Sequence, residues 1–512
     1  MRLNTSTLPS FSALIVAAGF LASAAQAASY QPKPNARELQ GVPVHVASSQ
    51  SVQKSVASAA TEKSAALRFA VDVGMPLNLA DGVWDSPEAG IARWRSEVIS
   101  VGAKSLSFEF GEFSLPVGAE LWIYDVNGEV LQGPYTHANE THEGKLWTAI
   151  VPSDAVVMEL RLPERQKASV GLALEKVHHG TISFAKMGEA AAKSGSCNVD
   201  AICSQADGWS NERSSVALLT IANNFLCTGE LVNNVRADGR PLLLTANHCQ
   251  AGTNASSVIS YWNYQTSICG GTPNGSLAQN LTGATNLAGD VNADFTLLQL
   301  NQKPNSAWNV YYAGWNASSA IPQSGVAFHH PQGGEKRVSV YNTAATRAPV
   351  YINGNLVQAW AVKWAQGITE SGSSGSALYN ESHQIVGTLS GGEASCANPG
   401  GTDYFARLEN AWTAQPASTG QLKAHLDPDN TGTLVLNGKS ASSASSTPVT
   451  VPTVPVEVPS TPSSSPSAPA PVSTAAASGS GGGGGAFGLN LLGLLATAFA
   501  ARKRLARRSA AA

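Results

Sequence analysis

The sequence predicts an all-β protein, and three observations support that fold class. Residues 105–110 alternate strictly between polar and apolar side chains, which is the period of a half-buried strand. Residues 121–131 place apolar runs on both sides of Asn127-Gly128, a strong short-range signal for a β-hairpin. From residue 194 to about residue 437 the strands are short and are separated by Gly and Asn turns, as an antiparallel barrel requires.

The composition of the chain indicates its compartment and argues against some classes of protein. The chain has 512 residues, enough for two or three domains, and its net charge of −3 gives no reason to expect nucleic acid binding. All six cysteines lie between Cys197 and Cys396, which predicts disulfides formed in an oxidising compartment. Metal ligation is the alternative, but no close Cys/His cluster has zinc spacing, so we expect no metal and no cofactor. The spacing alone does not choose among the possible pairings.

The N-terminus indicates export. Arg2 precedes a short apolar run over residues 11–21, which is followed by Ala25-Gln-Ala27. A basic start, a short apolar core and small residues at the cleavage point are typical of a signal peptide, here residues 1–27. A membrane anchor is the alternative, but the apolar run is short for a span.

Residues 28–193 form a separate β-rich region. Residues 28–66 are rich in Ser, Ala and Gln, and we expect them to be loosely ordered. Beyond the hairpin, further strands are predicted at residues 156–162 and 170–177. Together these strands predict a small β-sandwich that contains no cysteine, either a binding module or a propeptide.

A candidate nucleophile, Ser374, lies in the segment Gly372-Ser-Ser-Gly-Ser376. Flanking glycines allow the sharp turn that presents a serine Oγ to substrate, with the neighbouring amides directed at one point where an oxyanion would form. Such a string alone is typical of linkers. Its context favours an active site, because residues 384–392 read as a buried strand that ends at a substrate-binding edge.

A nucleophilic serine needs a base, and the base needs an orienting carboxylate. His248 lies in a turn of small residues after the apolar strand that begins at Pro241, and Asp294 opens an alternating strand. The chain order His, Asp, Ser is that of the chymotrypsin triad. Each residue alone has a structural explanation, but the three in this order and setting predict a catalytic triad of His248, Asp294 and Ser374.

These motifs resemble a chymotrypsin-fold serine protease and, more narrowly, the bacterial lysyl endopeptidases. The resemblance covers about Ser194 to Leu436. The matching segments are Cys227–Asn234, Thr245–Cys249, Asp294–Leu298, Gly372–Ser376, Ser196–Asp200, Tyr261–Gln265, Ala313–Trp315, His329–Pro331, Glu335–Arg337 and Ser395–Cys396. The resemblance implies a double antiparallel β-barrel with the active site between the barrels, and endopeptidase activity after lysine.

The resemblance also implies how the chain matures. It pairs Cys227 with Cys249, Cys197 with Cys396 and Cys203 with Cys269. Ahead of a secreted protease, the β-sandwich region is more readily a propeptide than a binding module, and cleavage after Lys193 would release a catalytic domain of residues 194–437. In the digestive relatives a new N-terminus pairs with an Asp just before the catalytic Ser. Ser373 carries no charge, so we expect latency to depend on the propeptide instead.

Further residues are assigned to substrate binding by the resemblance. The amides of Gly372 and Ser374 would form the oxyanion hole, and Ser390-Gly-Gly392 the strand that pairs with the substrate backbone. Asp403 would lie at the floor of the lysine pocket, with Tyr351 near the site. The family carries His in place of Ser390 and Trp near Tyr351, which leaves rate and pH optimum open.

Lysine content gives independent support for lysine specificity. Residues 194–437 contain four lysines, whereas residues 28–193 contain nine. A protease that cuts at lysine gains from a lysine-poor mature body and a lysine-rich propeptide. The mature segment also carries six arginines, so the choice between lysine and arginine stays open.

The C-terminal part of the chain predicts surface delivery. Residues 438–478 are rich in Ser, Pro and Thr and form a stiff disordered linker. Residues 479–512 combine a Gly run, a short apolar run and terminal arginines, which favour the cytoplasmic side. This tail resembles the Gly-Gly-type sorting signals of Gram-negative bacteria, which a rhomboid-like intramembrane protease removes. A plain tail anchor is the alternative.

The sequence therefore predicts an exported, secreted or surface-attached serine endopeptidase of a Gram-negative bacterium that acts through an acyl-enzyme. Its expected partners are protein or peptide substrates, the export and tail-processing machinery and, through the tail, a transient membrane contact. We expect a monomer. Two alternatives stay open, a trypsin-like protease with broader or different specificity and a catalytically weak surface-binding protease homologue.

Overall fold

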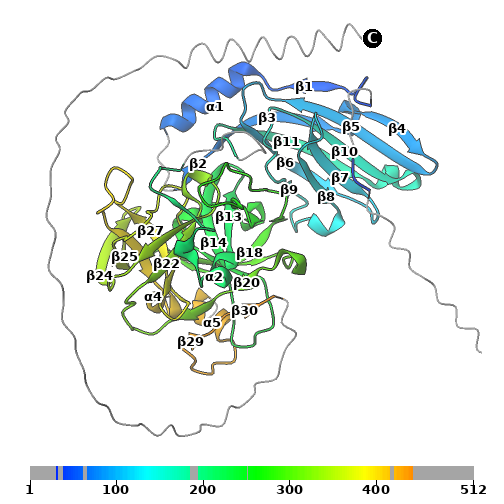
Figure 1. Cartoon of the computed structure of the whole chain (residues 1–512). Helices are drawn as coiled ribbons and strands as arrows, with labels where there is room; N and C mark the ends of the chain where they lie inside the picture. Colours follow the sequence, from blue (N-terminus) through cyan, green and yellow to red (C-terminus); the bar gives the residue numbers. More distant parts are fainter. Residues whose placement is uncertain are drawn as a thin grey trace, which may run out of the picture. The chain divides into compact units, whose positions relative to one another are not determined.

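The computed structural model describes residues 30–32, 38–61, 66–184, 194–250, 252–414 and 420–441. All elements below lie between residues 38 and 441, within one unit of the chain. Strands far outnumber helices, which confirms the all-β prediction (Figure 1). The predicted signal peptide, the Lys193 cleavage point, the linker after Ala441 and the tail lie outside the described residues. Within those ranges, no helix has the length and hydropathy of a membrane span.

The N-terminal region is the predicted β-sandwich. One sheet has the order β1-β5-β10-β7-β8 with β4 also paired to β5, and the other has the order β3-β11-β6-β9. Apolar side chains from both sheets, such as Phe108 and Leu160, pack into one core between them. The strands are β1 (Val44–Val46), β3 (Ala70–Asn78), β4 (Val83–Glu88), β5 (Ile91–Ile99), β6 (Ser105–Ser114), β7 (Glu120–Asp125), β8 (Leu131–Tyr135), β9 (Leu146–Trp147), β10 (Ala155–Pro163) and β11 (Gly171–Gly180).

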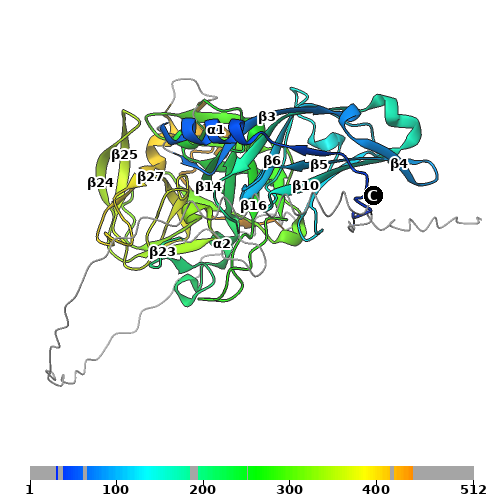
Figure 2. The same ribbon diagram turned by 90° about the horizontal axis from the view of Figure 1, so that it is seen from above.

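The expectation that residues 28–66 are loosely ordered is wrong for part of that segment. β1 pairs in parallel with β5, and α1 (Ser49–Thr61) lies along β3 in both ribbon views (Figures 1 and 2). Val52 packs against the sandwich core, and Ser55 Oγ donates a hydrogen bond of 2.6 Å to the Asp72 carbonyl. Tertiary packing, which composition does not reveal, therefore stabilises a helix of modest intrinsic propensity.

Residues 194–441, called the protease-like region after the resemblance above, contain two antiparallel sheets whose facing side chains share a core. The first has the order β17-β16-β13-β14-β15-β19-β18, and the second the order β12-β23-β22-β26-β27-β28-β25-β24. Leu244 of the first sheet and Phe328 of the second belong to the same apolar cluster. This arrangement is the predicted chymotrypsin-like domain. A final strand, β30 (Lys439–Ser440), pairs with β20 (Tyr311–Tyr312).

The strands of the first sheet are β13 (Val216–Ile221), β14 (Phe225–Val232), β15 (Leu242–Thr245), β16 (Ile259–Trp262), β17 (Asn280–Thr282), β18 (Ala284–Asp290) and β19 (Phe295–Leu300). Those of the second are β12 (Val199–Asp200), β22 (Gly325–His329), β23 (Arg337–Tyr341), β24 (Thr346–Ile352), β25 (Asn355–Val362), β26 (Ala377–Asn380), β27 (Gln384–Gly392) and β28 (Asp403–Arg407), with β21 (Gly314–Asn316) and β29 (Val435–Leu436) at its margin. Short helices α2 (Ser210–Ser215), α3 (Asn247–Gln250), α4 (Leu408–Trp412) and α5 (Leu422–Leu426) complete the region.

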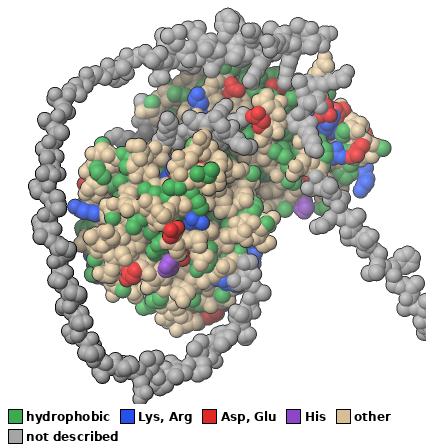
Figure 3. All heavy atoms as spheres, viewed as in Figure 1, with side chains coloured by type: hydrophobic (Ala, Val, Ile, Leu, Met, Phe, Trp, Pro, Cys, Tyr) green, Lys and Arg blue, Asp and Glu red, His purple; other side chains and the backbone are tan. Residues whose placement is uncertain are grey.

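Uncharged polar side chains and backbone predominate on the face drawn in Figure 3. Lysine and arginine are scattered over it rather than gathered in one patch. This distribution agrees with a chain in which only 13% of residues are charged.

The sandwich and the first protease sheet share a hydrophobic core. Phe69, Trp147 and Ile150 of the sandwich pack with Leu226 and Tyr261 of the sheet. The short strand β2 (Leu67–Arg68) adds to the edge of β14. The hydroxyl of Tyr261 accepts a hydrogen bond of 2.9 Å from the Ile150 amide. The two parts are therefore joined by packing of the kind found inside a domain.

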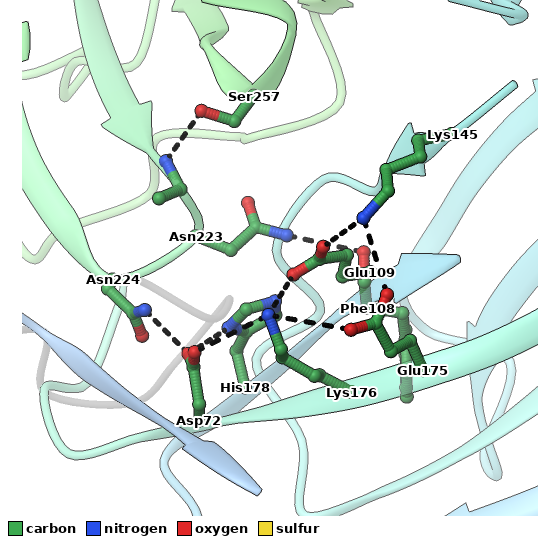
Figure 4. A network of polar contacts seen from close by, with 11 residues as sticks. Asp72, Phe108, Glu109, Lys145, Glu175, Lys176, His178, Asn223, Asn224 and Ser257 are labelled. Carbon is green, nitrogen blue, oxygen red and sulfur yellow. Dashed lines mark hydrogen bonds and ion pairs between the residues drawn. The ribbon is translucent and has the colours of Figure 1, made fainter. Parts of the chain in front are cut away.

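A polar network surrounds this contact (Figure 4). The turn between β13 and β14 supplies Asn224, whose side-chain amide donates to Asp72 Oδ1 at 2.5 Å, while His178 Nδ1 lies 3.0 Å from the same oxygen. Burial alone would raise the pKa of Asp72, but interactions with His178, Asn224 and Lys176 lower it to about 2. Asp72 is therefore ionised at any physiological pH, and it holds the turn between β13 and β14 through its hydrogen bond from Asn224.

We predict that Tyr261→Phe lowers the free energy of unfolding of the full-length chain by about 1–3 kcal/mol, because it leaves the buried Ile150 amide without a partner. Urea unfolding, carried out in a Ser374→Ala background to prevent self-cleavage, measures the change. Tyr351→Phe is the control, since Tyr351 is 73% exposed and its variant should unfold like the parent. Equal stability of the Tyr261 variant and the parent would contradict the prediction.

Candidate active site

Two neighbouring strands bring His248 and Asp294 together. β15 pairs with β19, so the helix α3 that follows β15 lies beside the residue that precedes β19. His248 Nδ1 is 2.9 Å from Asp294 Oδ2, and the His248 amide donates to Asp294 Oδ1 at 3.0 Å. Both side chains are buried. The carboxylate thus orients the imidazole and leaves Nε2 as the nitrogen free to act on a substrate or nucleophile.

The Ser374 turn is pressed against the segment that carries His248. Gly372 and Gly375 have φ values of +94° and +85°, which favour glycine. A Cβ on Gly375 would collide with Thr245 Oγ1 and lie 2.9 Å from the Ala246 amide nitrogen. The Thr228 amide donates to the Ser374 carbonyl at 2.8 Å. The structure therefore brings all three predicted triad residues to one place.

Two backbone amides in this turn have no partner among the described residues. The amides of Ser373, Gly375 and Ser376 donate to carbonyls of the protein. Those of Gly372 and Ser374 make no such hydrogen bond in the described part of the chain. Because buried amides are nearly always paired, two free ones beside a half-buried serine can donate hydrogen bonds to an anionic oxygen.

A neutral hydrogen-bond relay holds the same turn from behind. His329 Nδ1 is 2.8 Å from Ser373 Oγ, and His329 Nε2 is 2.9 Å from Ser339 Oγ. Ser339 Oγ donates in turn to the Ile368 carbonyl, and Ser373 Oγ accepts from the Glu370 amide. The directions are consistent throughout if Nε2 carries the proton. Burial lowers the pKa of His329 to about 3, so the relay is uncharged at neutral pH.

Asp403 lies on β28 opposite Gly392, at the end of β27, which is the second strand after the Ser374 turn. β27 pairs with β28 so that Gly392 faces Asp403, and Leu389 of β27 accepts a hydrogen bond from the Gly375 amide. Asp403 is buried, and burial raises the pKa of its carboxyl despite hydrogen bonds from Trp364, Thr369 and Ala394. An ionised carboxylate without a cation is costly there, so the site favours a positively charged ligand.

Fewer contacts tie the other predicted substrate-binding residues to the site. The Ser390 hydroxyl is buried without a partner among the described residues. A Cβ on Gly391 would lie 3.5 Å from Ile352 Cδ1, so the β24–β25 hairpin approaches this edge. Tyr351, beside Ile352, is 73% exposed, and no described contact brings it to the triad.

Sequence reasoning missed three residues of the site. Trp364 and Thr369 hold Asp403, and His329 holds the Ser374 turn. The motif that contains His329 gives that residue no role by itself. Thr369 is only five positions before Ser374, which gives a weak indication that it belongs to the site. Nothing in the local sequence around Trp364 indicates a contact with Asp403.

The disulfides are Cys197–Cys396, Cys203–Cys269 and Cys227–Cys249, the same three pairs that the resemblance implied. Cys227–Cys249 links β14 to the helix that carries His248. Among the described residues no group of His, Cys, Asp and Glu is arranged to hold a metal ion.

Part of the chain is similar in sequence to known proteins. Residues 191–406 match the family described as lysyl endopeptidase, C-terminal domain. A lysyl endopeptidase of Pseudomonas aeruginosa is 31% identical over 289 residues, which cover 52% of this chain and 62% of that protein. The match therefore spans less than two thirds of the relative's length.

Two solved structures are also similar. The active form of the Rv3671c protease from M. tuberculosis has a TM-score of 0.30 and 18% identity, over 46% of this chain and 97% of that one. The MamO protease domain from Magnetospirillum magneticum has a TM-score of 0.30 and 11% identity, over 41% of this chain and 100% of that one.

The buried histidine predicts a pH dependence of stability. Because the pKa of His329 is lowered in the folded state, only the unfolded chain binds that proton as the pH falls below about 6.5. Stability is then lost by about 2 kcal/mol between pH 6.5 and pH 5 through this residue. We expect the free energy of unfolding of His329→Gln to fall less than that of the parent between pH 8 and pH 5, because the contribution of His329 is removed. Urea unfolding at both pH values, in the Ser374→Ala background, measures the difference.

His142→Gln serves as the control, since the side chain of His142 is 80% exposed. Its variant should lose stability with falling pH as steeply as the parent. A His329→Gln variant that declines just as steeply would show that the relay histidine does not contribute.

Proposed function

We propose that this chain is a serine endopeptidase that hydrolyses peptide bonds through an acyl-enzyme, with cleavage after lysine. One observation carries the proposal: the buried His248–Asp294 pair lies against a glycine-bounded turn that presents Ser374 beside two unpartnered amides. The match of residues 191–406 to the lysyl endopeptidase family supports the same reaction.

The proposed mechanism follows from the positions of these groups. Ser374 Oγ attacks the scissile carbonyl while His248 Nε2 takes its proton, and His248 then gives that proton to the leaving amine. Asp294 holds the imidazole through Nδ1 and stabilises the imidazolium. The Gly372 and Ser374 amides donate hydrogen bonds to the oxyanion, and loss of one such donor typically costs about 3 kcal/mol. Water then releases the acyl group by the same route.

The proposed specificity depends on Asp403. Its buried carboxylate lacks a cation in the described structure, and a lysine ammonium would supply one. The edge of β27 at Ser390, Gly391 and Gly392 leads from the Ser374 turn to Asp403. A substrate strand paired there would direct its side chain toward that carboxylate.

Export, maturation and attachment complete the proposal. The three disulfides fit an oxidising compartment. We propose that the β-sandwich is the propeptide, that cleavage after Lys193 frees the protease, and that the C-terminal tail directs surface delivery of a monomeric enzyme with peptide or protein substrates. Support for the propeptide role is the shared core between the sandwich and the first protease sheet.

Ser374→Ala should abolish amidase activity and labelling by a fluorophosphonate, because the nucleophilic oxygen is removed. Circular dichroism and urea unfolding should show an unchanged fold. Ser214→Ala is the matched control, since Ser214 is a partly buried residue of α2 whose hydroxyl bonds within that helix, outside the site, and it should keep full labelling. A parent protein that is not labelled would favour the catalytically weak homologue, and a Ser374 variant with parental turnover would assign the nucleophile elsewhere.

Asp403→Asn should reduce kcat/KM for lysine substrates by about a hundredfold or more, because the substrate ammonium loses its charged partner. The raised pKa of Asp403 means that ionisation opposes folding above its unfolded pKa, so the Asn variant should be at least as stable as the parent at pH 8. Matched peptides that differ only before the cleaved bond, together with urea unfolding, test both parts. Preferred parental cleavage after Glu or Phe would refute the lysine pocket.

A further inference from the structure

The two oxygens of Asp403 are used unequally. Oδ2 accepts two short hydrogen bonds from side chains, one from Trp364 Nε1 at 2.6 Å and one from Thr369 Oγ1 at 2.7 Å. Oδ1 accepts a longer bond of 3.2 Å from the Ala394 amide. A carboxylate oxygen offers about two lone-pair positions, so the acceptor capacity of Oδ2 is filled by the protein.

The donors to Oδ2 are held in place. The indole of Trp364 makes edge-to-face contacts with Tyr341 and Phe405, at centroid distances of 6.3 Å and 5.9 Å. All three rings belong to one buried cluster. Thr369 is 5% exposed and belongs to the segment that leads to the Ser374 turn. The Trp364 indole cannot turn away from Asp403 without disturbing the packing of these rings.

Gly392 lies directly beside Oδ1 of Asp403. A Cβ on Gly392 would collide with Asp403 Oδ1, so only glycine permits this approach of β27 to the carboxylate. Gly392 is itself exposed, at the end of the strand that leads from the Ser374 turn. The less occupied oxygen therefore faces the same strand edge along which the substrate is proposed to bind.

Lysine and arginine place different demands on such a carboxylate. A guanidinium is planar and binds best through two parallel hydrogen bonds, one to each carboxylate oxygen. An ammonium is a compact charge that can bind through a single oxygen. At Asp403 the two-oxygen arrangement would require displacement of Trp364 or Thr369, whereas contact through Oδ1 alone would not.

We propose that Trp364 and Thr369 are the residues that select lysine over arginine, by occupying Oδ2 of Asp403. They act as positioning residues, since they touch the carboxylate rather than the substrate. This inference rests on the proposed function, in which Asp403 binds the side chain of the residue before the cleaved bond.

The test compares kcat/KM for matched peptides that carry Lys or Arg before the cleaved bond, with enzyme produced from the full chain. Thr369→Val keeps the shape of the side chain and removes one donor to Oδ2, and Trp364→Phe removes the other. We expect the Lys:Arg ratio of kcat/KM to fall at least tenfold in Thr369→Val and further in the double variant, chiefly through KM for the arginine peptide.

Two variants guard against a merely structural explanation. Thr369→Ser keeps the hydroxyl and should retain the parental ratio. Trp412→Phe changes a buried tryptophan whose ring lies tilted against Trp315 elsewhere in the region, and it should also leave the ratio unchanged. Folded Thr369→Val and double variants with the parental Lys:Arg ratio would overturn the proposal and would show that another feature, such as pocket depth, excludes arginine.

A binding measurement separates this proposal from the proposed function. Butylammonium and propylguanidinium represent the ends of the two side chains, and their inhibition constants report on the pocket without catalysis. In the parent, butylammonium should inhibit more strongly, and Thr369→Val should narrow the difference. If Asp403→Asn weakens both inhibitors while Thr369→Val leaves their ratio unchanged, the pocket assignment stands and the selection mechanism fails. If Asp403→Asn affects neither inhibitor, the pocket itself is wrong.

Discussion

The hydrogen bond from the Thr228 amide to the Ser374 carbonyl joins the two sheets of the protease region at the candidate active site. Around it, Gly375 lies so close to Thr245 and Ala246 that no side chain would fit. A close-packed interior transmits such a constraint, because neighbouring groups cannot move independently. The position of Ser374 relative to His248 therefore depends on the packing of one sheet on the other, and so does everything that the site can do.

The turn that carries Ser374 is held by neutral groups rather than by an ion pair. His329 connects Ser373 to Ser339, and each hydrogen bond in this buried relay has a donor and an acceptor. A satisfied buried network is rigid and specifies one arrangement. Among the described residues no charged terminus takes part in this relay, and the candidate active-site turn is held by it in a chain that includes the β-sandwich.

The two buried aspartates of the site differ in what surrounds them. Asp294 is paired with His248, whose backbone amide also donates to it. Asp403 has hydrogen-bond donors but no cationic partner in the described part of the chain, and burial raises its pKa. A buried charge without a partner lowers stability, and such a cost is typical of positions where a ligand supplies the missing charge. The structure thus distinguishes a carboxylate that orients a side chain from one that has no cationic partner among the described residues.

The sequence by itself determined the local features: the β-strands, the two glycines around Ser374, and the His, Asp and Ser in their order. These depend on short-range pattern and on backbone conformation, which neighbouring residues impose. Only the tertiary structure decided which oxygen of Asp403 accepts fewer hydrogen bonds, what His329 contacts, and that residues 49–61 form a helix. The physical reason is that these features arise from contacts between residues far apart in the chain. Trp364 and Asp403 are 39 positions apart, and Ile150 and Tyr261 are 111 apart.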